Sequence, residues 1–497
     1  KKNVLALSIA AMIGGLGFAG AASAQLAVKE SGTGHMLLVP YYTAQDGNMS
    51  VFHVVNTDTT NGKALKVRFR GASNSDDVLD FKVFMPPGDV WTAAVVKGAN
   101  DVASLVTADG TCTLPAIAKN TPVSFVQDRL PADMPAADKA NNTREGYVEI
   151  FNMADIDSSK QAVYGGVGNT IPVNAPLYTA IKHVNGVAPC SDSVLQGTLA
   201  TGAGTPGLLP PTDGLMGSWY IINVPQTTTF SGAANAIIAT GATRNVFSPQ
   251  STGAATLPSA DPLFKSAILT AQNYDVPDLS TPYLAATTLN QAGADAQAAA
   301  LTAALAQTSV INQFSTDTSV TAKTDWVFSM PTRRYNVAAN YAVKSTDAAY
   351  RVYNAAVGSY FTAGNTTVNA AGQICLSSIN QTFFDREETF ATSGAVFSPG
   401  NVTRLPLCGE VSVLSFASGS VLGASVAAST SGATYANGWG RVNFAAPGVP
   451  VLGASFQKVS NPNARAGISG TSGITWPHAS KSARHFSRSR ALNCRRN

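Results

Sequence analysis

Short apolar runs separated by turn-forming residues dominate the chain from Gly34 onward. Apolar and polar residues alternate within several of these runs, as in Lys66-Val67-Arg68-Phe69-Arg70. Alternation with a period of two, broken by turns roughly every 8–12 residues, is typical of an antiparallel β-sandwich or barrel. We therefore expect a mainly β protein with an Ig-like antiparallel β-sandwich. The first runs are His35–Tyr42, Ser50–Asn56, Ala64–Arg70, Val78–Met85 and one that begins at Trp91.

The same pattern returns later in the chain. The segment Asp128–Arg144 is polar and punctuated by proline, which predicts a long loop. Val163–Met216 is rich in Gly, Pro and Thr and predicts loops with short strand pieces. Further strands are expected at Tyr147–Met153, Gly217–Val224, Ala234–Thr240, Trp326–Met330, Ala349–Val357, Gln381–Phe390, Glu410–Phe416 and Gly438–Phe444.

One segment, Ser259–Ser309, differs from the rest because it is rich in alanine. Asp261 followed by Pro262 is a helix-start signal, and Ala is the strongest helix former. Leu301 and Leu305 lie four residues apart and mark a packing face on the expected helix. We predict a helical insertion, with helix concentrated in Asp261–Gln307; a low-complexity linker is the alternative.

These patterns divide the chain into five regions. Residues 1–24 are expected to be a signal peptide, because Lys1 and Lys2 precede the apolar stretch Val4–Ala22, which ends in the cleavage pattern Ala22-Ser23-Ala24. We expect a first β-sandwich part with long loops at 25–258 and the helical insertion at 259–320. A β region at 321–478 completes the sandwich or forms a second one, and 479–497 is a basic disordered tail.

Charge changes the picture of possible partners. The chain has 33 Lys and Arg against 29 Asp and Glu, but eight of the basic residues lie in the first two and the last seventeen positions. The remaining chain is therefore slightly acidic, which speaks against a nucleic-acid-binding body. Only 12% of all residues are charged. A surface so poor in charge favours assembly with neighbours over free diffusion.

Five cysteines suit an exported protein, in which disulfides form readily. Four lie in the body, and four cysteines allow three connectivities. We predict the local pairing, Cys112 with Cys190 and Cys375 with Cys408, which keeps each bridge within one half of the chain. The alternative is buried free thiols. Cys494 lies in the basic tail, and its role is left open.

Few residues suggest catalysis or metal binding. Asp76, Asp77 and Asp80 could bind calcium, but their spacing departs from a calcium-loop motif, and we expect a solvated turn. His35 and His53 lie on neighbouring expected strands without a third ligand. No zinc motif, serine-nucleophile motif or other catalytic signature is present, so we expect neither an enzyme nor a bound cofactor.

Two charge clusters of opposite sign stand out in so uncharged a chain. Arg333 and Arg334 follow one expected strand, whereas Asp385, Glu387 and Glu388 lie in another. Paired carboxylates can hydrolyse glycans, but consecutive residues in a strand point to opposite faces. We predict a structural ion pair between one of the arginines and one of the three carboxylates, within the chain or at a subunit contact.

Several blocks resemble secreted Gram-negative cell-surface proteins of the S-layer type. The resemblance covers about a quarter of the chain and lies in VPYYTAQDGNMSVFHVVNT, DVLDFKVFMPPGDVWTA, DWVFSMPTRRY, FDREET and LCGEVSVLSF. It implies a β-rich, self-assembling protein on the outer membrane, with copies of itself as partners and outer-membrane lipopolysaccharide as a further one. The alternatives are a secreted adhesin or glycan-binding surface module and an outer-membrane β-barrel porin.

Overall fold

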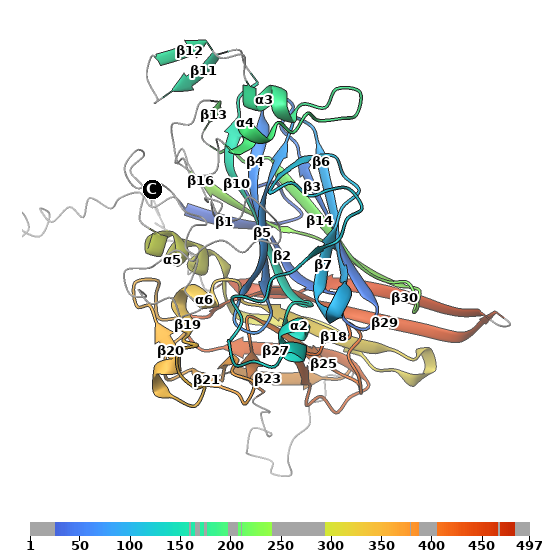
Figure 1. Ribbon diagram of the computed structural model, residues 1–497. Helices are drawn as coiled ribbons and strands as arrows, with labels where there is room; N and C mark the ends of the chain where they lie inside the picture. The colour runs from blue at the N-terminus through green and yellow to red at the C-terminus, as the bar shows by residue number, and fades with distance from the viewer. Residues whose placement is uncertain are drawn as a thin grey trace, which may run out of the picture.

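The computed structural model shows a mainly β protein with several antiparallel sheets and few helices (Figure 1). Among the strands of the described residues, β25 and β26 form the one parallel pair. The structure describes residues 25–158, 161–164, 169–172, 176–196, 207–209, 211–240, 294–377, 379–386, 405–465 and 468–482. The expected signal peptide lies outside the described residues.

The first half of the chain forms two large sheets, which we call sheets I and II. Sheet I has the order β1-β16-β2-β10-β4-β5-β8, with β13 paired to β10, and sheet II has the order β15-β14-β3-β6-β7-β9. The strands of sheet I are β1 (Gln25–Glu30), β16 (Asn235–Thr240), β2 (Met36–Thr43), β10 (Glu145–Ile156), β4 (Gly62–Gly71), β5 (Asp77–Met85), β8 (Cys112–Leu114) and β13 (Leu208–Leu209). Those of sheet II are β15 (Thr228–Ala233), β14 (Leu215–Asn223), β3 (Asn48–Asn56), β6 (Val90–Lys97), β7 (Ala103–Val106) and β9 (Val123–Ser124).

The second half forms two further sheets, III and IV. Sheet III has the order β23-β27-β17-β28, with β31 paired to β17, and sheet IV has the order β26-β25-β18-β29-β30. The strands of sheet III are β23 (Ile379–Phe384), β27 (Asn437–Phe444), β17 (Ala306–Ser315), β28 (Val449–Pro450) and β31 (Ala479–Ser482). Those of sheet IV are β26 (Ala428–Thr430), β25 (Val411–Ser415), β18 (Lys323–Ser329), β29 (Leu452–Arg465) and β30 (Ile468–Pro477).

Small sheets and short helices fill the edges of the molecule. The small sheets contain β11 (Gln161–Tyr164) with β12 (Asn169–Pro172), β19 (Val337–Ala339) with β20 (Arg351–Tyr353), and β21 (Thr366–Val368), β22 (Ile374–Leu376) and β24 (Leu407–Cys408). The helices are α2 (Ala136–Asn142), α3 (Pro176–Ile181), α4 (Asp192–Gln196), α5 (Ala294–Leu305), α6 (Arg333–Asn336), η1 (Ala99–Asp101), η3 (Thr318–Val320) and η4 (Ala348–Tyr350).

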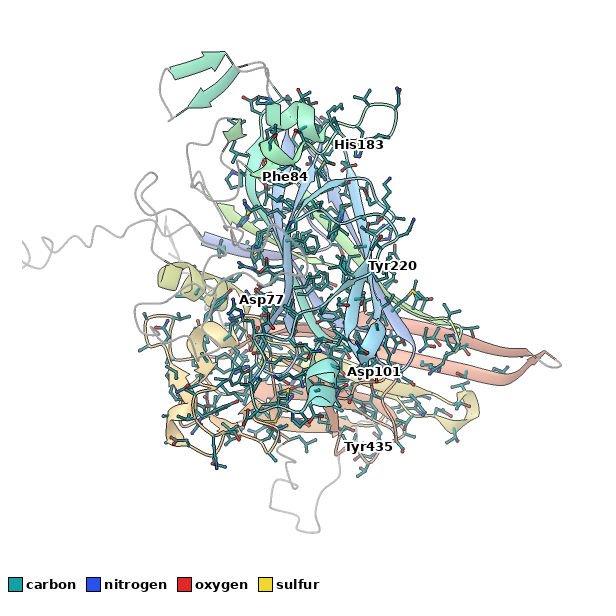
Figure 2. All side chains as sticks on the ribbon, viewed as in Figure 1. Asp77, Phe84, Asp101, His183, Tyr220 and Tyr435 are labelled. Atoms are coloured by element: carbon teal, nitrogen blue, oxygen red, sulfur yellow. A yellow bond between two sulfur atoms is a disulfide. The ribbon has the colours of Figure 1, made fainter. Side chains whose placement is uncertain are left out.

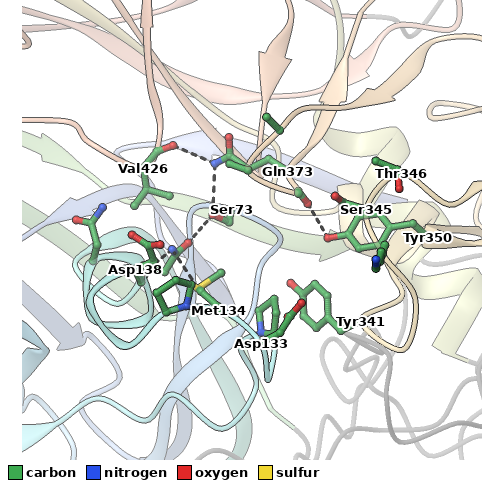
Figure 3. Close-up of a pocket in the computed structure, with 18 of the residues that line it drawn as sticks. Ser73, Asp133, Met134, Asp138, Tyr341, Ser345, Thr346, Tyr350, Gln373 and Val426 are labelled. Atoms are coloured by element: carbon green, nitrogen blue, oxygen red, sulfur yellow. Dashed lines mark hydrogen bonds between the residues drawn. The ribbon is translucent and has the colours of Figure 1, made fainter.

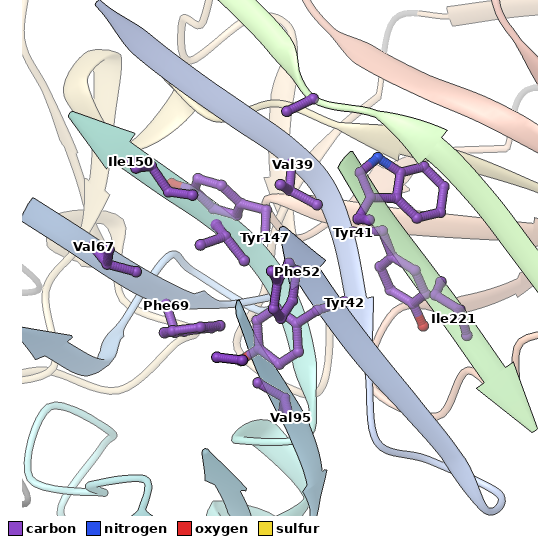
Figure 4. Close-up of a cluster of buried hydrophobic side chains, with 14 of the residues drawn as sticks. Val39, Tyr41, Tyr42, Phe52, Val67, Phe69, Val95, Tyr147, Ile150 and Ile221 are labelled. Atoms are coloured by element: carbon purple, nitrogen blue, oxygen red, sulfur yellow. The ribbon is translucent and has the colours of Figure 1, made fainter. Parts of the chain in front are cut away.

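Sheets I and II share the largest hydrophobic core. Alternate residues of each strand point into it, among them Val67 and Phe69 of β4 and Phe52 of β3, all almost fully buried. The ring of Phe69 makes edge-on contacts with the rings of Phe52 and Tyr42, each with 5.6 Å between centroids. Figure 4 shows these aromatic side chains meeting between the strands. Burial of such side chains supplies the main stabilisation of this half.

Strand β18 connects the two halves because both of its faces are buried. Val327 points into the core of sheets I and II, together with Val411, Val413 and Phe456 of the second half. Its neighbours Trp326 and Phe328 point the other way, into the core under sheet III. Because side chains alternate along a strand, one seven-residue strand serves both cores. The four large sheets therefore form one continuous packed body.

The strands expected early in the chain are confirmed, as is helix near Leu301 and Leu305. Both leucines lie in α5 and are buried against Leu26 and Ile237 of sheet I. Within the span 259–320 expected as a helical insertion, α5 ends at Leu305 and β17 begins at Ala306. The remainder of the predicted helix, before Ala294, lies outside the described residues.

Three further expectations need correction. The expected loop Asp128–Arg144 contains α2, and the expected disordered tail begins with β31, which pairs with β17. The longest hairpin, β29 with β30, was missed altogether. Its sequence is rich in Gly, Ser and Asn, and these residues are depleted in strands, so propensity concealed it. Pairing with β18 over its first seven residues overrides that weak preference.

Candidate functional site

Both predicted disulfides are present in the structure. Cys112 of β8 is bonded to Cys190 after α3, and this bond ties the edge of sheet I to the helices that cover it. Cys375 of β22 is bonded to Cys408 of β24, its direct neighbour in a small sheet. Each bridge therefore braces the edge of one half. Cys494 lies outside the described residues.

The polar face of sheet I carries buried ion pairs. The Lys63 ammonium lies 2.8 Å from the Asp155 carboxylate, and the Lys66 ammonium lies 2.7 Å from the Asp80 carboxylate. Arg70 Nε lies 3.1 Å from a Glu149 carboxylate oxygen. All six side chains are at most 1% exposed. The alternating pattern of β4 and β5 therefore does not mark a solvated face, because charges occupy the polar positions and are paired inside the protein.

The solvated turn expected at the aspartates is wrong. Asp76, Asp77 and Asp80 are each at most 1% exposed. Asp76 accepts a hydrogen bond from the Tyr341 hydroxyl at 2.7 Å, and one Asp77 oxygen lies 3.7 Å from Arg70 Nη1. Figure 2 places Asp77 near the middle of the molecule. Asp80 and Asp77 lie beside basic side chains and Asp76 accepts a hydrogen bond, whereas no local pattern in the sequence indicates these partners.

The turn between β4 and β5, residues 71–76, is the point where the two halves of the chain interlock. We call it the junction turn. Arg334 Nη1 donates to the Ser75 carbonyl at 2.7 Å, and the Glu410 backbone N–H donates to the Ala72 carbonyl at 2.8 Å. Asn74 contributes from the other side, since its amide donates to the Gly372 carbonyl at 3.0 Å. Residues more than 250 positions apart are thereby held against one turn.

Arg333 and Glu410 form the buried ion pair beside this turn. Arg333 Nη2 lies 2.7 Å from a Glu410 carboxylate oxygen, and both side chains are at most 1% exposed. Gly409 precedes the carboxylate with φ +85, and a Cβ there would lie 2.5 Å from the Ala72 carbonyl oxygen. Only glycine therefore fits this position, both for its backbone conformation and for its close approach to the turn.

Of the three carboxylates predicted to pair with Arg333 or Arg334, the structure describes only Asp385. Asp385 directly follows β23 and is partly buried, whereas Glu387 and Glu388 lie outside the described residues. The pairing of Arg333 or Arg334 with that cluster stays a prediction. Sequence reasoning missed Glu410, although it stands in the block LCGEVSVLSF. Glu410 is a lone carboxylate at the start of an apolar expected strand. A charge buried there needs a partner, and this could have indicated an ion pair.

A polar pocket of about 630 Å³ opens beside the junction turn (Figure 3). Five segments line it: Ser73 of the turn, the region around α2, the segment that includes Tyr341 and Tyr350, the residues up to Gln373, and Ser425 with Val426. The pocket is thus built by both halves of the chain. Two aspartates, Asp133 and Asp138, and one lysine, Lys344, supply its charged groups.

The histidines have separate structural roles. His35 Nδ1 lies 3.5 Å from an Asp213 carboxylate oxygen, and the His53 ring packs edge-on against Tyr220. His478, which was not singled out from the sequence, lies between sheets III and IV. Its Nε2 lies 2.8 Å from the Val327 carbonyl oxygen, and its ring stacks on Phe328. Burial lowers the pKa of His478 to about 4, so the ring is neutral near pH 7.

Two buried carboxylates hold loops of the second half in place. Glu145 accepts hydrogen bonds from the backbone N–H groups of Val426 and Ala427, each at 3.1 Å. Asp325 accepts from the Leu422 N–H at 3.0 Å. Burial raises the pKa of both carboxyl groups, and these hydrogen bonds oppose the rise. Backbone N–H groups of the loop at 422–427 are among the donors to both carboxylates, and this arrangement positions the loop.

Within the described part of the chain, no three His, Cys, Asp or Glu side chains lie together so that they could hold a metal ion. No helix among the described residues is long and apolar enough to cross a membrane. Comparison of the chain with protein-family models, with curated proteins and with solved structures finds no match.

Proposed function

We propose that this chain is a structural, non-catalytic protein of the bacterial cell surface that assembles with copies of itself. The distribution of charge carries the proposal. Sixteen Asp, Glu, Lys and Arg side chains are buried among the described residues, in a chain that has 62 in all. Only 12% of all residues are charged, and some of these charges are paired inside the protein, so the surface carries few charges for its size. Repulsion between copies is weak on such a surface, and neighbours can pack closely.

The long hairpin β29–β30 supplies an element for such packing. β29 has 14 residues and β30 has 10, whereas the adjacent β18 has seven. Figure 1 shows the hairpin extending well beyond the other strands of its sheet. We call the part beyond Ser460 and Thr471, which are paired with each other, the arm. A projecting arm increases the surface that one copy can present to the next.

The resemblance to S-layer-type proteins supports this proposal, because several of the resembling blocks lie close together in the structure. The blocks DWVFSMPTRRY and LCGEVSVLSF contain Arg333, Arg334 and Glu410, and the junction turn lies directly before the block DVLDFKVFMPPGDVWTA. These blocks therefore meet at one place, which holds the fold together. Two disulfides also suit an oxidising compartment, and export to the cell surface provides one.

The finer architecture belongs to the same proposal. Sheets I and II enclose a common core, and sheets III and IV enclose another. We infer a β-sandwich arrangement of the Ig-like kind for these sheet pairs, which gives stiff blocks with exposed loops at their ends. Stiff blocks suit a protein layer, because a lattice needs subunits that keep one shape.

Electron microscopy of the purified chain tests this function directly. Residues 25–497 are secreted from a bacterial host and concentrated with and without outer-membrane vesicles that contain lipopolysaccharide. We expect regular arrays or filaments by negative stain, and sedimentation of species larger than a monomer. A chain that stays monomeric under all of these conditions would overturn the proposal. That result would favour the alternative function, a secreted adhesin or glycan-binding surface module.

A further inference from the structure

The pocket beside the junction turn has a fixed polar floor. The Ser73 hydroxyl donates to the Asn142 side-chain oxygen at 2.5 Å, and the Gln373 amide lies 3.3 Å from the same hydroxyl. The Gln373 amide also donates to the Val426 carbonyl at 2.9 Å. Asn142 and Gln373 are 7% and 5% exposed. Because these groups hold one another in place, the floor is organised before any ligand arrives.

The wall of the pocket combines an aromatic ring with apolar side chains. Tyr341 is partly exposed, and its hydroxyl donates to Asp76 at 2.7 Å, which fixes the orientation of the ring. Pro131 and Met134, from the region before α2, also line the pocket. Figure 3 shows Asp133 between Tyr341 on one side and Met134 and Asp138 on the other. A ring of this kind can stack on the C–H face of a ligand.

The rim of the pocket supplies hydrogen-bonding groups that remain accessible. Asp133 and Asp138 are exposed, and each carboxylate can accept hydrogen bonds from two hydroxyl or amino groups. Lys344 is the one base among the lining residues. The formal charge of the lining is therefore negative. An anionic ligand is disfavoured, whereas a neutral or amino-bearing ligand is not.

We propose that this pocket binds a neutral or amino-bearing saccharide unit. A saccharide presents hydroxyl groups around its edge and an apolar C–H face, and the pocket offers carboxylates and amides together with an aromatic wall. A volume of about 630 Å³ lies in the range of small-molecule sites and has room for one or two sugar residues. The site goes beyond the proposed structural function, because it would operate in a single copy of the chain.

Titration calorimetry with the whole secreted chain, residues 25–497, tests the site. The probes are di-N-acetylchitobiose, lactose, glucosamine and glucuronic acid. We expect binding of at least one of the first three, and weaker or no binding of glucuronic acid. The double variant Asp133→Asn/Asp138→Asn should weaken that binding at least tenfold. Asp101→Asn is the matched control, since Asp101 is an exposed carboxylate that does not line the pocket.

The results of this experiment distinguish failure of the saccharide site from failure of the proposed structural function. Absence of binding by every neutral and amino-bearing probe overturns the site, as does equal affinity of the parent chain and the double variant. Tighter binding of glucuronic acid also overturns it, because the charge argument then fails. Array formation by the double variant is scored separately. Loss of saccharide binding with intact arrays supports the pocket and leaves the structural function untouched.

Discussion

Arg333 and Glu410 show how much a single residue matters at the junction turn. Their ion pair is buried, so replacing one partner leaves the other charge without compensation. We expect Glu410→Gln to lower the free energy of unfolding by about 3–5 kcal/mol. Urea denaturation followed by tryptophan fluorescence measures this change, since Trp326 lies in β18 at the interface between the halves.

The exposed pair Lys97 and Asp101 provides the control for this prediction. Its atoms lie 2.7 Å apart, but its side chains are 51% and 65% exposed. Water screens such a pair, and Lys97→Ala should change the free energy of unfolding by no more than about 1 kcal/mol. Equal losses in Glu410→Gln and Lys97→Ala would contradict the assigned role of the junction pair.

His478 makes stability depend on pH. Its pKa in the folded chain, about 4, lies below the ordinary value of 6.5, so the unfolded chain takes up the proton more readily. The stabilisation is complete above about pH 6.5 and is lost as the pH falls toward 4. Full desolvation would make this loss roughly 3 kcal/mol, and partial access of water to the ring makes it smaller.

Thermal unfolding at pH 7 and pH 4.5 measures this effect. We expect His478→Gln to show a smaller loss of stability between the two pH values than the parent chain, because glutamine does not take up a proton. The buried carboxyl groups of Glu145 and Asp325 are common to both chains, so their contributions cancel in the comparison. Parallel losses in the two chains would exclude His478 as the source.

At the scale of elements, the two disulfides differ in the length of chain that they enclose. Cys112 and Cys190 are 78 residues apart, and Cys375 and Cys408 are 33 apart. Removal of either bridge by paired serine substitution should cost roughly 3–5 kcal/mol if the loss is mainly loop-closure entropy. The longer loop should cost more by about 0.8 kcal/mol. Chemical denaturation of the two double variants compares them, and a larger loss for the shorter loop would refute the entropic account.

The sequence predicted elements well where period and propensity agree. The early strands β2 to β6 combine β-branched or aromatic residues with clear turns, and their positions are confirmed within a few residues. The hairpin β29–β30 has the opposite character, since its Gly and Ser residues conceal strands that exist through pairing with β18. Propensity is local, whereas this pairing joins residues more than 120 positions apart, and no local pattern records it.

The residues around the junction turn show that local sequence patterns also fail to predict long-range contacts in the candidate site. The sequence identified Arg333 and Arg334 as unusual, because charge is scarce in this chain. It did not identify Glu410, nor the pocket that Ser73, Tyr341 and Gln373 line, because their proximity arises from the packing of both halves. Local pairing of the cysteines was predicted correctly, since it required only that each bridge stay within its half.

For the whole molecule, the arm offers a direct test of assembly. Replacing residues 461–470 with Asn-Gly closes the hairpin after the pair Ser460 and Thr471, with a turn that suits two-residue hairpins. We expect the melting temperature to stay within a few degrees, because the arm lies beyond the shared cores. Assembly, followed by light scattering against concentration, should need at least tenfold more protein.

Arg441→Ser is the control for the arm. Arg441 is exposed on β27, which belongs to sheet III, whereas the arm belongs to sheet IV. Its replacement removes a surface charge without shortening any strand. Assembly by the trimmed chain at the same concentration as the parent would show that the arm has no part in the contacts between copies.

Because β18 contributes to two cores, the first half of the chain cannot complete its core until the second half has been synthesised. Val67 and Phe69 leave the ribosome early, but Val327, Val413 and Phe456, which complete the same core, are made hundreds of residues later. The first half therefore carries exposed apolar surface until nearly the whole chain is available. Such an intermediate is prone to aggregate, and its native contacts close over long separations. We therefore expect that a holding chaperone that covers the early half raises the yield of folded protein, and that truncation near the end of the chain lowers it.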